Sequence, residues 1–171
     1  FTPPCSVPSA TTNAASNITT STATLNGTVN ANSFSTTVTF EYGTTTGYGS
    51  STAATPSPVP GSSNTSVSAG VIGLTPNTLY HYRVKTINCG GAIDGNDQTF
   101  TTPCPVPSAS TSAATSLSNT TATLNGTINA NNFSTAVTFE YGITTSYGST
   151  VTATQSPVTG NTNTTVKATL I

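Results

Sequence analysis

The sequence is short of charge. Only 4% of its 171 residues are charged, whereas an ordinary soluble domain carries about 25%. The net charge at pH 7 is -1, so the chain has no basic surface that could neutralise phosphates, and we expect no nucleic-acid partner. It also has no run of about 18 apolar residues, so we expect no membrane span in this segment. Polarity comes from Thr, Ser and Asn instead, a composition that suits secreted and surface proteins.

Methionine and tryptophan are absent. The chain starts with neither Met nor a signal-like segment, so we interpret it as a mature or excised piece. Helix formers are scarce, β-branched residues are abundant, and no apolar stripe recurs every 3.6 residues, so we predict an all-β fold. A disordered Ser/Thr-rich stalk is the alternative, and the regular apolar alternation described below disfavours it.

What the sequence does contain is a copy of itself. Residues 1–72 align with residues 100–171 at a constant offset of 99, without a gap, and about two positions in three are identical. Leu25 to Thr28 returns as Leu124 to Thr127, for example. A fixed period near 100 residues predicts tandem domains, each large enough to bury a modest core.

The alignment also predicts the domain boundaries. We expect residues 1–4 to be the end of a preceding repeat, residues 5–102 to be a complete domain, and residues 103–171 to be a second repeat that lacks its last two strands. The missing strands would come from a longer array or from another chain. Without them, we expect Val137, Phe139 and Tyr141 to be open to water.

Alternating apolar and polar residues mark the strands. Residues 22–29 and 37–43 alternate cleanly, as half-buried antiparallel strands do. The predicted strands are 6–14, 22–29, 37–43, a short edge strand or loop within 44–51, 67–71, 78–88 and 97–102, with a turn at 90–95. About seven short strands at regular spacing are typical of a two-sheet sandwich. The predicted core is Leu25, Val38, Phe40, Tyr42, Val67, Leu74, Tyr80, Tyr82 and Val84.

One stretch is more specific. Leu74, Pro76 and Tyr80 stand in a Leu-x-Pro-x-Thr-x-Tyr run that resembles the tyrosine corner of fibronectin type III domains, a family of immunoglobulin-like sandwiches. In that family the Tyr hydroxyl bonds back to the backbone of the corner, a role that the resemblance gives to Tyr80. The run from Phe40 to Gly49 is similar to tandem repeats of bacterial cell-surface and extracellular proteins of this type.

The sequence departs from that family in having no Trp for the core, so Phe40 or Tyr42 must fill the volume. The resemblance also implies a disulfide, because the start of the first strand (Cys5) and the end of the penultimate strand (Cys89) share one pole of such a sandwich. Cys104 matches Cys5 and is expected to be unpaired or paired outside this segment.

Two other roles for the cysteines are less favoured. A Cys89–Cys104 bridge would have to span a strand of about 20 Å. A zinc site lacks Cys-x-x-Cys or His pairing. The Cys5–Cys89 bridge implies an oxidising compartment, so we expect an extracellular or cell-surface protein.

Ionisable side chains are too few to suggest catalysis. The single histidine, His81, lies on the outer face of its strand, and it cannot form a Ser-His-Asp arrangement unless an acid converges on it. We expect neither enzymatic activity nor a cofactor. Glu41 and Arg83 point outward from strands that neighbour each other in this fold, so we predict a cross-strand ion pair.

The only clustered acids are Asp94 and Asp97. They could hold calcium, but their spacing does not match an EF-hand loop, and Asp-Gly is a strong turn signal. A plain turn is the preferred interpretation, calcium is the alternative, and we expect no other metal site. Seven sequons are possible glycosylation sites: Asn17, Asn26, Asn64, Asn119, Asn125, Asn132 and Asn163.

From these features we predict a structural repeat of an extracellular fibre, stalk or filament, with copies of itself and possibly glycans as partners. The prolines in residues 101–107 would stiffen the joint between domains. Strand complementation between copies is a possible part of this hypothesis. One alternative is an adhesin repeat that binds carbohydrate or protein through loop aromatics, for which Phe34, Phe133, Tyr48 and Tyr147 are the candidates. The other is a spacer module of a secreted enzyme.

Overall fold

The computed structural model describes residues 4–171, and within them the chain forms strands β1 to β13 and no helix. The predicted all-β class is therefore confirmed. The chain divides into two compact units, Phe1–Cys104 (unit 1) and Pro105–Ile171 (unit 2). Of the expected end of a preceding repeat, residues 1–3 lie outside the described residues. The described part contains no helix that is long and apolar enough to cross a membrane.

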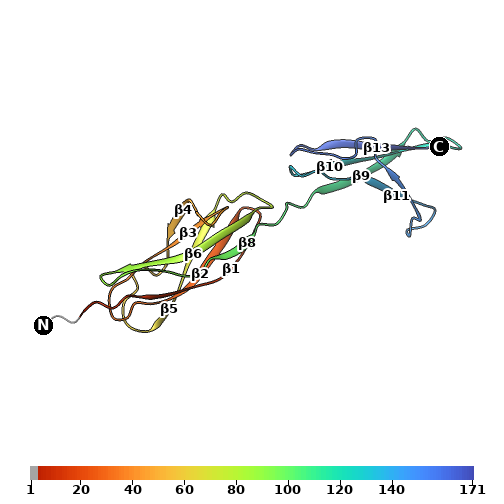
Figure 1. Cartoon of the computed structure of the whole chain (residues 1–171). Helices are drawn as coiled ribbons and strands as arrows, with labels where there is room; N and C mark the ends of the chain where they lie inside the picture. Colours follow the sequence, from red (N-terminus) through yellow and green to blue (C-terminus); the bar gives the residue numbers. More distant parts are fainter. Residues whose placement is uncertain (1–3) are drawn as a thin grey trace. The chain divides into compact units, whose positions relative to one another are not determined.

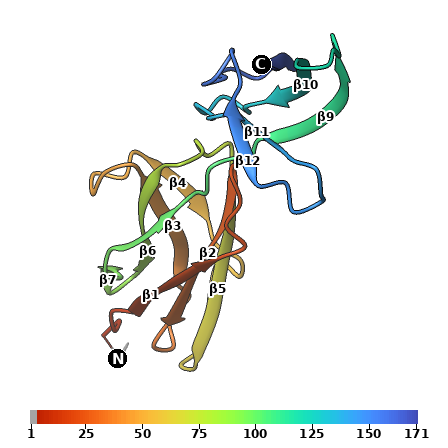
Figure 2. The same ribbon diagram turned by 90° about the vertical axis from the view of Figure 1, so that its right-hand side faces the viewer.

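Unit 1 is a sandwich of two antiparallel sheets (Figures 1 and 2). One sheet has the order β1-β2-β5, and the other has the order β4-β3-β6-β7, with β8 also paired to β6. The strands are β1 (Ser9–Ser16), β2 (Thr22–Asn30), β3 (Thr37–Gly43), β4 (Ser50–Ala53), β5 (Asn64–Ile72), β6 (Leu79–Asn88), β7 (Gly91–Asp94) and β8 (Gln98–Thr101).

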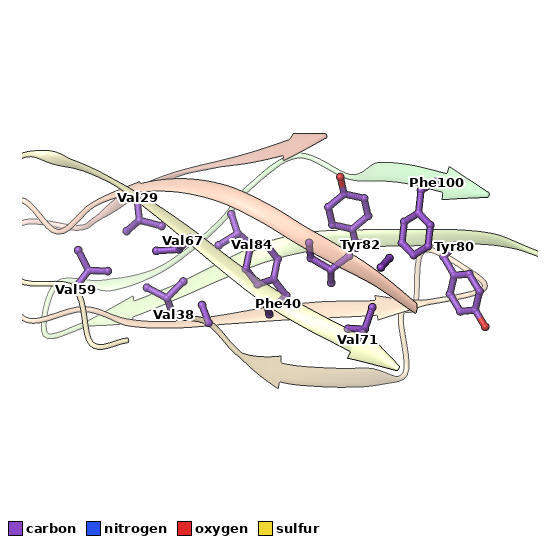
Figure 3. Packing of buried hydrophobic residues seen from close by; sticks show 14 of the residues in the cluster. Val29, Val38, Phe40, Val59, Val67, Val71, Tyr80, Tyr82, Val84 and Phe100 are labelled. Carbon is purple, nitrogen blue, oxygen red and sulfur yellow. The ribbon is translucent and has the colours of Figure 1, made fainter. Parts of the chain in front are cut away.

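The core of unit 1 follows the period of two in the sequence. Side chains of β2, β3, β5 and β6 that alternate inward meet between the sheets (Figure 3). Tyr82 and Phe40 are fully buried, and Phe100 packs edge-on against Tyr82 with the ring centroids 5.7 Å apart. Of the nine predicted core residues, eight are buried, namely Leu25, Val38, Phe40, Val67, Leu74, Tyr80, Tyr82 and Val84.

Tyr42 is the ninth, and here the prediction was wrong, since this ring is only half-buried. It lies next to the end of β3, where the chain leaves the sandwich, so the ring packs against the core from its margin. The chain has no tryptophan, and either Phe40 or Tyr42 was expected to fill that volume in the core. Phe40 is fully buried and therefore fills it.

The expected turn at residues 90–95 was also wrong. Only Cys89 and Gly90 turn the chain, and β7 then pairs with β6 from Asn88↔Gly91 to Lys85↔Asp94. The strand breaks at Gly95, and β8 resumes the pairing opposite Leu79–Tyr82. The Val84 carbonyl accepts a bond from the Gly95 N–H (2.8 Å), whereas the Val84 N–H donates to the buried Thr12 hydroxyl of the other sheet (3.1 Å).

One predicted strand range was displaced, since the first strand begins at Ser9 rather than at residue 6. For residues 44–51 a short edge strand or a loop was expected, and the structure has a loop at 44–49 followed by β4 from Ser50. The loop forms because Tyr48 and Gly49 both have positive φ (56° and 89°), and a strand cannot continue through such angles. The loop also turns tightly, since a Cβ at Gly43 would overlap the Tyr48 carbonyl.

Unit 2 has five strands in two sheets, with the orders β13-β10-β9 and β11-β12. They are β9 (Ser108–Thr115), β10 (Ala122–Asn129), β11 (Thr138–Tyr141), β12 (Ser149–Thr152) and β13 (Thr164–Leu170). Val137 and Phe139 were expected to be open to water, but only 6% and 9% of their surface is exposed. They pack in one core with Ile128 and Val166, and Tyr141 is half-buried.

Candidate functional site

Most acidic and basic side chains of the chain, together with one tyrosine, lie on one face of unit 1, which we call the charged face. They come from β3, β6 and β7, and from the loops before β4 and β8, and they point outward because their neighbours in the alternation fill the core. The charged face consists of Glu41, Tyr48, His81, Arg83, Lys85, Asp94 and Asp97.

Glu41 is the centre of this face. It stands directly opposite Arg83 in the β3–β6 register, and Arg83 donates to its Oε2 from Nε (2.9 Å) and Nη2 (2.8 Å). The predicted cross-strand ion pair is thereby confirmed. Lys85 Nζ bonds to the other carboxylate oxygen (2.9 Å), and Arg83 Nη1 lies 2.9 Å from Asp94 Oδ2.

The pKa values follow from these contacts. The hydrogen bond from Lys85, joined by that from Arg83, holds the pKa of Glu41 below its usual range, although partial burial acts in the opposite direction. The bond to Glu41 raises the pKa of Arg83. Both shifts favour the charged forms of Glu41 and Arg83, as the ion pair between them is expected to do.

Tyr48 covers one side of the network. The Arg83 guanidinium carbon lies 4.9 Å from the centroid of the Tyr48 ring, a cation–π distance. The Tyr48 hydroxyl donates to Asp97 Oδ1 (3.0 Å). Partial burial, together with this bond to a carboxylate, raises the pKa of Tyr48.

An acid does converge on the histidine. His81 Nδ1 lies 2.8 Å from Asp97 Oδ2, and the same carboxylate accepts the bond from Tyr48. A Ser-His-Asp arrangement would need a hydroxyl on the other ring nitrogen. The hydrogen bonds found among residues 4–171 give His81 no serine or threonine partner. The Asp97 carboxylate, between β7 and β8, links His81 of β6 to Tyr48 of the loop before β4.

A polar groove of about 450 Å³ runs beside this network. Its lining combines two charged side chains, an aromatic ring and several hydroxyls. The lining residues are Glu41, Thr46, Gly47, Tyr48, Gly49, Ser50, Ser51 and Arg83. A groove of this composition can exchange hydrogen bonds in both directions and can offer the face of a ring.

The two clustered acids serve different partners. Asp94 is paired with Arg83, and Asp97 is paired with His81 and Tyr48. No group of three or more His, Cys, Asp or Glu side chains suited to a metal ion occurs in the part of the chain that the structure describes. The Asp94-Gly95 dipeptide forms the break between β7 and β8 rather than a simple turn.

The residues singled out by the fibronectin resemblance lie at opposite ends of β6. Cys5 and Cys89 form a disulfide with their Cα atoms 5.8 Å apart, and Cys104 is an exposed free thiol. The Tyr80 hydroxyl accepts a hydrogen bond from the Thr75 backbone N–H (2.9 Å). That bond ties β6 to the corner between buried Leu74 and half-buried Pro76.

The repeated Leu-Asn-Gly-Thr motif has a structural role that the sequence reading missed. Asn26 Nδ2 donates to the Ala14 carbonyl (2.9 Å) and to the Ser16 hydroxyl (3.0 Å), across the irregularity in β1. Asn125 bridges β9 in the same way. The amides of these two sequons are thus engaged and half-buried, whereas the other five are exposed: Asn17, Asn64, Asn119, Asn132 and Asn163.

The four loop aromatics fall into different environments. Phe34 and Phe133 are half-buried, at matching places before β3 and β11. Tyr48 is half-buried on the charged face, but Tyr147 is 52% exposed. The sequence reading ranked the four equally because periodicity does not describe loops.

Comparison with known proteins finds few matches. No family model matches, and no curated protein matches. Among solved structures, the chain is similar to the sensor domain of the anti-sigma factor RsgI4 from Pseudobacteroides cellulosolvens. A shorter form is 24% identical with a TM-score of 0.42, and the match covers 58% of this chain and 98% of that one. A longer form is 23% identical with a TM-score of 0.40, and the match covers 66% and 100%.

These neighbours correct the functional prediction. Both are sensor domains of an anti-sigma factor, which is a sensing role rather than that of a fibre repeat. The interpretation of the chain as a fibre, stalk or filament repeat was therefore wrong. It had inferred a mechanical role chiefly from the duplication and the Pro-rich joint, and neither specifies what each copy does.

Proposed function

We propose that the chain is the ligand-recognition part of a protein that works outside the cytoplasm, and that unit 1 binds a small, uncharged, hydroxyl-rich ligand on its charged face. One observation carries this proposal. The chain has only three basic and four acidic residues. Two of the basic residues, three of the acidic residues and the single histidine nevertheless lie together beside one groove. Charges that served solubility alone would be spread over the surface.

The ligand class follows from how these charges are used. Both cations of the face already have carboxylate partners, so neither a polyanion nor a polycation would find free counter-charge there. The groove still offers the hydroxyls of Ser50 and Ser51 and the ring of Tyr48. A ligand with several hydroxyls can exchange hydrogen bonds with these groups and rest its C–H surface on the ring.

Three further assignments belong to the same proposal. The Cys5–Cys89 disulfide supports an extracellular location at the cell surface. The order of the strands and the bond between Tyr80 and Thr75 support a fibronectin type III-like sandwich for unit 1. The proposed role is binding without catalysis, because the Asp97 carboxylate that contacts His81 also accepts the hydrogen bond that holds the Tyr48 loop.

The experiment is an amide NMR titration of the full chain with glycerol, glucose and maltotriose. We expect shifts at residues 41–51 and at Arg83, lost in Tyr48→Ala and retained in the matched variant Tyr147→Ala. Glucosamine and gluconate, which carry charge, should bind more weakly than glucose. The proposal is overturned if no neutral probe shifts these amides, or if Tyr48→Ala leaves the shifts unchanged.

A further inference from the structure

We infer that unit 1 binds a linear, neutral oligosaccharide, which lies in the groove beside the charged face and continues over the Tyr48 loop into a second groove. The groove beside the charged face, which Glu41 and Arg83 line, is called the first groove here. The inference rests on the proposed function and names the class of ligand.

The second groove has a volume of about 370 Å³ and opens at the end of β3. Rings, hydroxyls and one strongly exposed aliphatic side chain line it, and these are Tyr42, Tyr48, Tyr80, Thr44, Ser50 and Ile72. None of its lining residues in the described part of the chain is charged. A charged group that entered this groove would lose water without gaining a counter-charge, so the part of the ligand that lies there is neutral.

The two grooves meet at the Tyr48 loop, because Tyr48 and Ser50 line both of them. In the β3–β4 register, Ser51 stands opposite Glu41, and both line the first groove. The next pair, Ser50 opposite Tyr42, lines the second groove. Adjacent residues of a strand point to opposite faces, so the grooves open on opposite faces of the β3–β4 ribbon, with the loop between them.

The passage over the loop is open at Gly49. This glycine lines both grooves, and a Cβ placed on it would meet no atom within 4 Å. Because the grooves open on opposite faces, a single sugar ring contacts only one of them. A chain of rigid rings joined by rotatable bonds can lie in the first groove and bend over Gly49 into the second.

Tyr42 supplies a polar group that the fold does not use. The hydroxyls of Tyr48, Tyr80 and Tyr82 each have a hydrogen-bond partner within unit 1. Among the hydrogen bonds of residues 4–171, none involves the Tyr42 hydroxyl, and no buried side-chain polar atom of these residues lacks a partner. The Tyr42 hydroxyl is therefore accessible, and its half-buried ring holds it in place. It can both donate and accept, as a sugar hydroxyl does.

Ile72 supplies an apolar surface at the border of the second groove. It is 82% exposed, which makes it the most exposed large apolar side chain among the described residues of unit 1. A single exposed apolar side chain needs no explanation by itself, but this one lies beside the hydroxyls of Thr44 and Ser50. A sugar ring has C–H faces and hydroxyl edges, so it can cover Ile72 and exchange hydrogen bonds at the same time.

The test is an amide NMR titration of the full chain with glucose, maltotetraose and cellotetraose, so that both α and β linkages are sampled. Glucose should shift amides of the first groove and leave residues 72–74 unchanged, because residues 72–74 line only the second groove. At least one tetraose should also shift residues 72–74 and bind at least about fivefold more tightly than glucose. N-acetyl-tetraalanine amide, a neutral peptide, should not shift these residues.

The variant Tyr42→Phe isolates the second groove, because it removes the accessible hydroxyl and keeps the ring. It should weaken binding of the tetraose about fivefold and leave binding of glucose unchanged. Tyr141→Phe makes the same change at the matching position of unit 2 and should alter neither.

Three results would overturn the inference: neither tetraose shifts residues 72–74, the peptide shifts them as a tetraose does, or Tyr42→Phe leaves binding of the tetraose unchanged. Equal weakening of glucose and tetraose by Tyr42→Phe would overturn it too, since the hydroxyl would then act on the first groove. In each of these cases, glucose shifts at residues 41–51 would leave the proposed function standing. Absence of binding by every sugar would overturn both.

Discussion

Strands β3 and β11 carry nearly the same sequence, and they differ in the structure. From Val38 to Gly43 every residue recurs in Val137 to Gly142, yet β3 is seven residues long and β11 is four. β3 pairs with β4 and with β6, whereas the one partner of β11 in the described part of the chain is β12. The comparison teaches that the second neighbour, rather than the local sequence, sets the length of this strand.

Burial differs in the same way. Leu25 is fully buried in unit 1, but its counterpart Leu124 is half-buried. Thr12 is 4% exposed because it accepts a bond from Val84 of β6, whereas its counterpart Thr111 is exposed. Strand β6 thus provides core side chains, hydrogen bonds and charge together.

The largest difference is expected in the core. Phe40→Ala should lower the free energy of unfolding of unit 1 by about 3–5 kcal/mol, because a fully buried ring leaves a cavity between two complete sheets. Phe139→Ala should cost unit 2 less, since β11 and β12 can relax into the space. Urea unfolding followed by NMR signals assigned to each unit measures both, and equal losses would contradict the comparison.

Within residues 4–171 the structure has one disulfide, and it lies in unit 1. It joins residues separated by 84 positions, so replacing Cys5 and Cys89 together by Ser should destabilise unit 1 by about 2–4 kcal/mol. Unit 2 is the internal control, and its urea midpoint should not move. A drop in both midpoints would show that the two units unfold together.

The tyrosine corner is expected to contribute less. Tyr80→Phe removes the acceptor of the Thr75 N–H and keeps the ring against Phe100, with which it stacks at 5.5 Å. The loss should be about 1–2 kcal/mol in unit 1. Thermal unfolding of Tyr80→Phe beside the wild type measures it, and an unchanged Tm would assign no stabilising role to this bond.

The smallest expected effect concerns acid. The pKa of Glu41 is lowered in the folded state, mainly by the bond from Lys85, so its contribution to stability is present above the ordinary glutamate pKa. This contribution is lost as the pH falls through the lowered value. Glu41→Gln should therefore destabilise unit 1 at pH 7, and the difference from wild type should shrink below about pH 4. Urea midpoints between pH 7 and pH 3 test this, and a difference that stays constant would refute it.

Much of the fold could be predicted because period-two alternation marks the strands that face the core. The same alternation placed Glu41 and Arg83 on the outer face and so predicted their pairing. It also placed His81 on that face, but it could not predict how Asp94, Asp97 and Tyr48 join the charged face. Asp94 and Asp97 flank a break in the edge pairing that was expected to be a turn, and Tyr48 reaches Arg83 only because two consecutive residues of its loop have positive φ.

Amide hydrogen exchange tests the central claim most directly, namely that β6 and not the repeated sequence defines the structure of unit 1. The amides of Thr37–Gly43 that bond to β6 should exchange slowly, at a rate limited by unfolding of unit 1. The counterparts of these amides in residues 136–142 should exchange on the order of 100-fold faster or more, because among residues 4–171 the one strand that pairs with β11 is β12. Equal protection at matched positions in the two units would contradict the account.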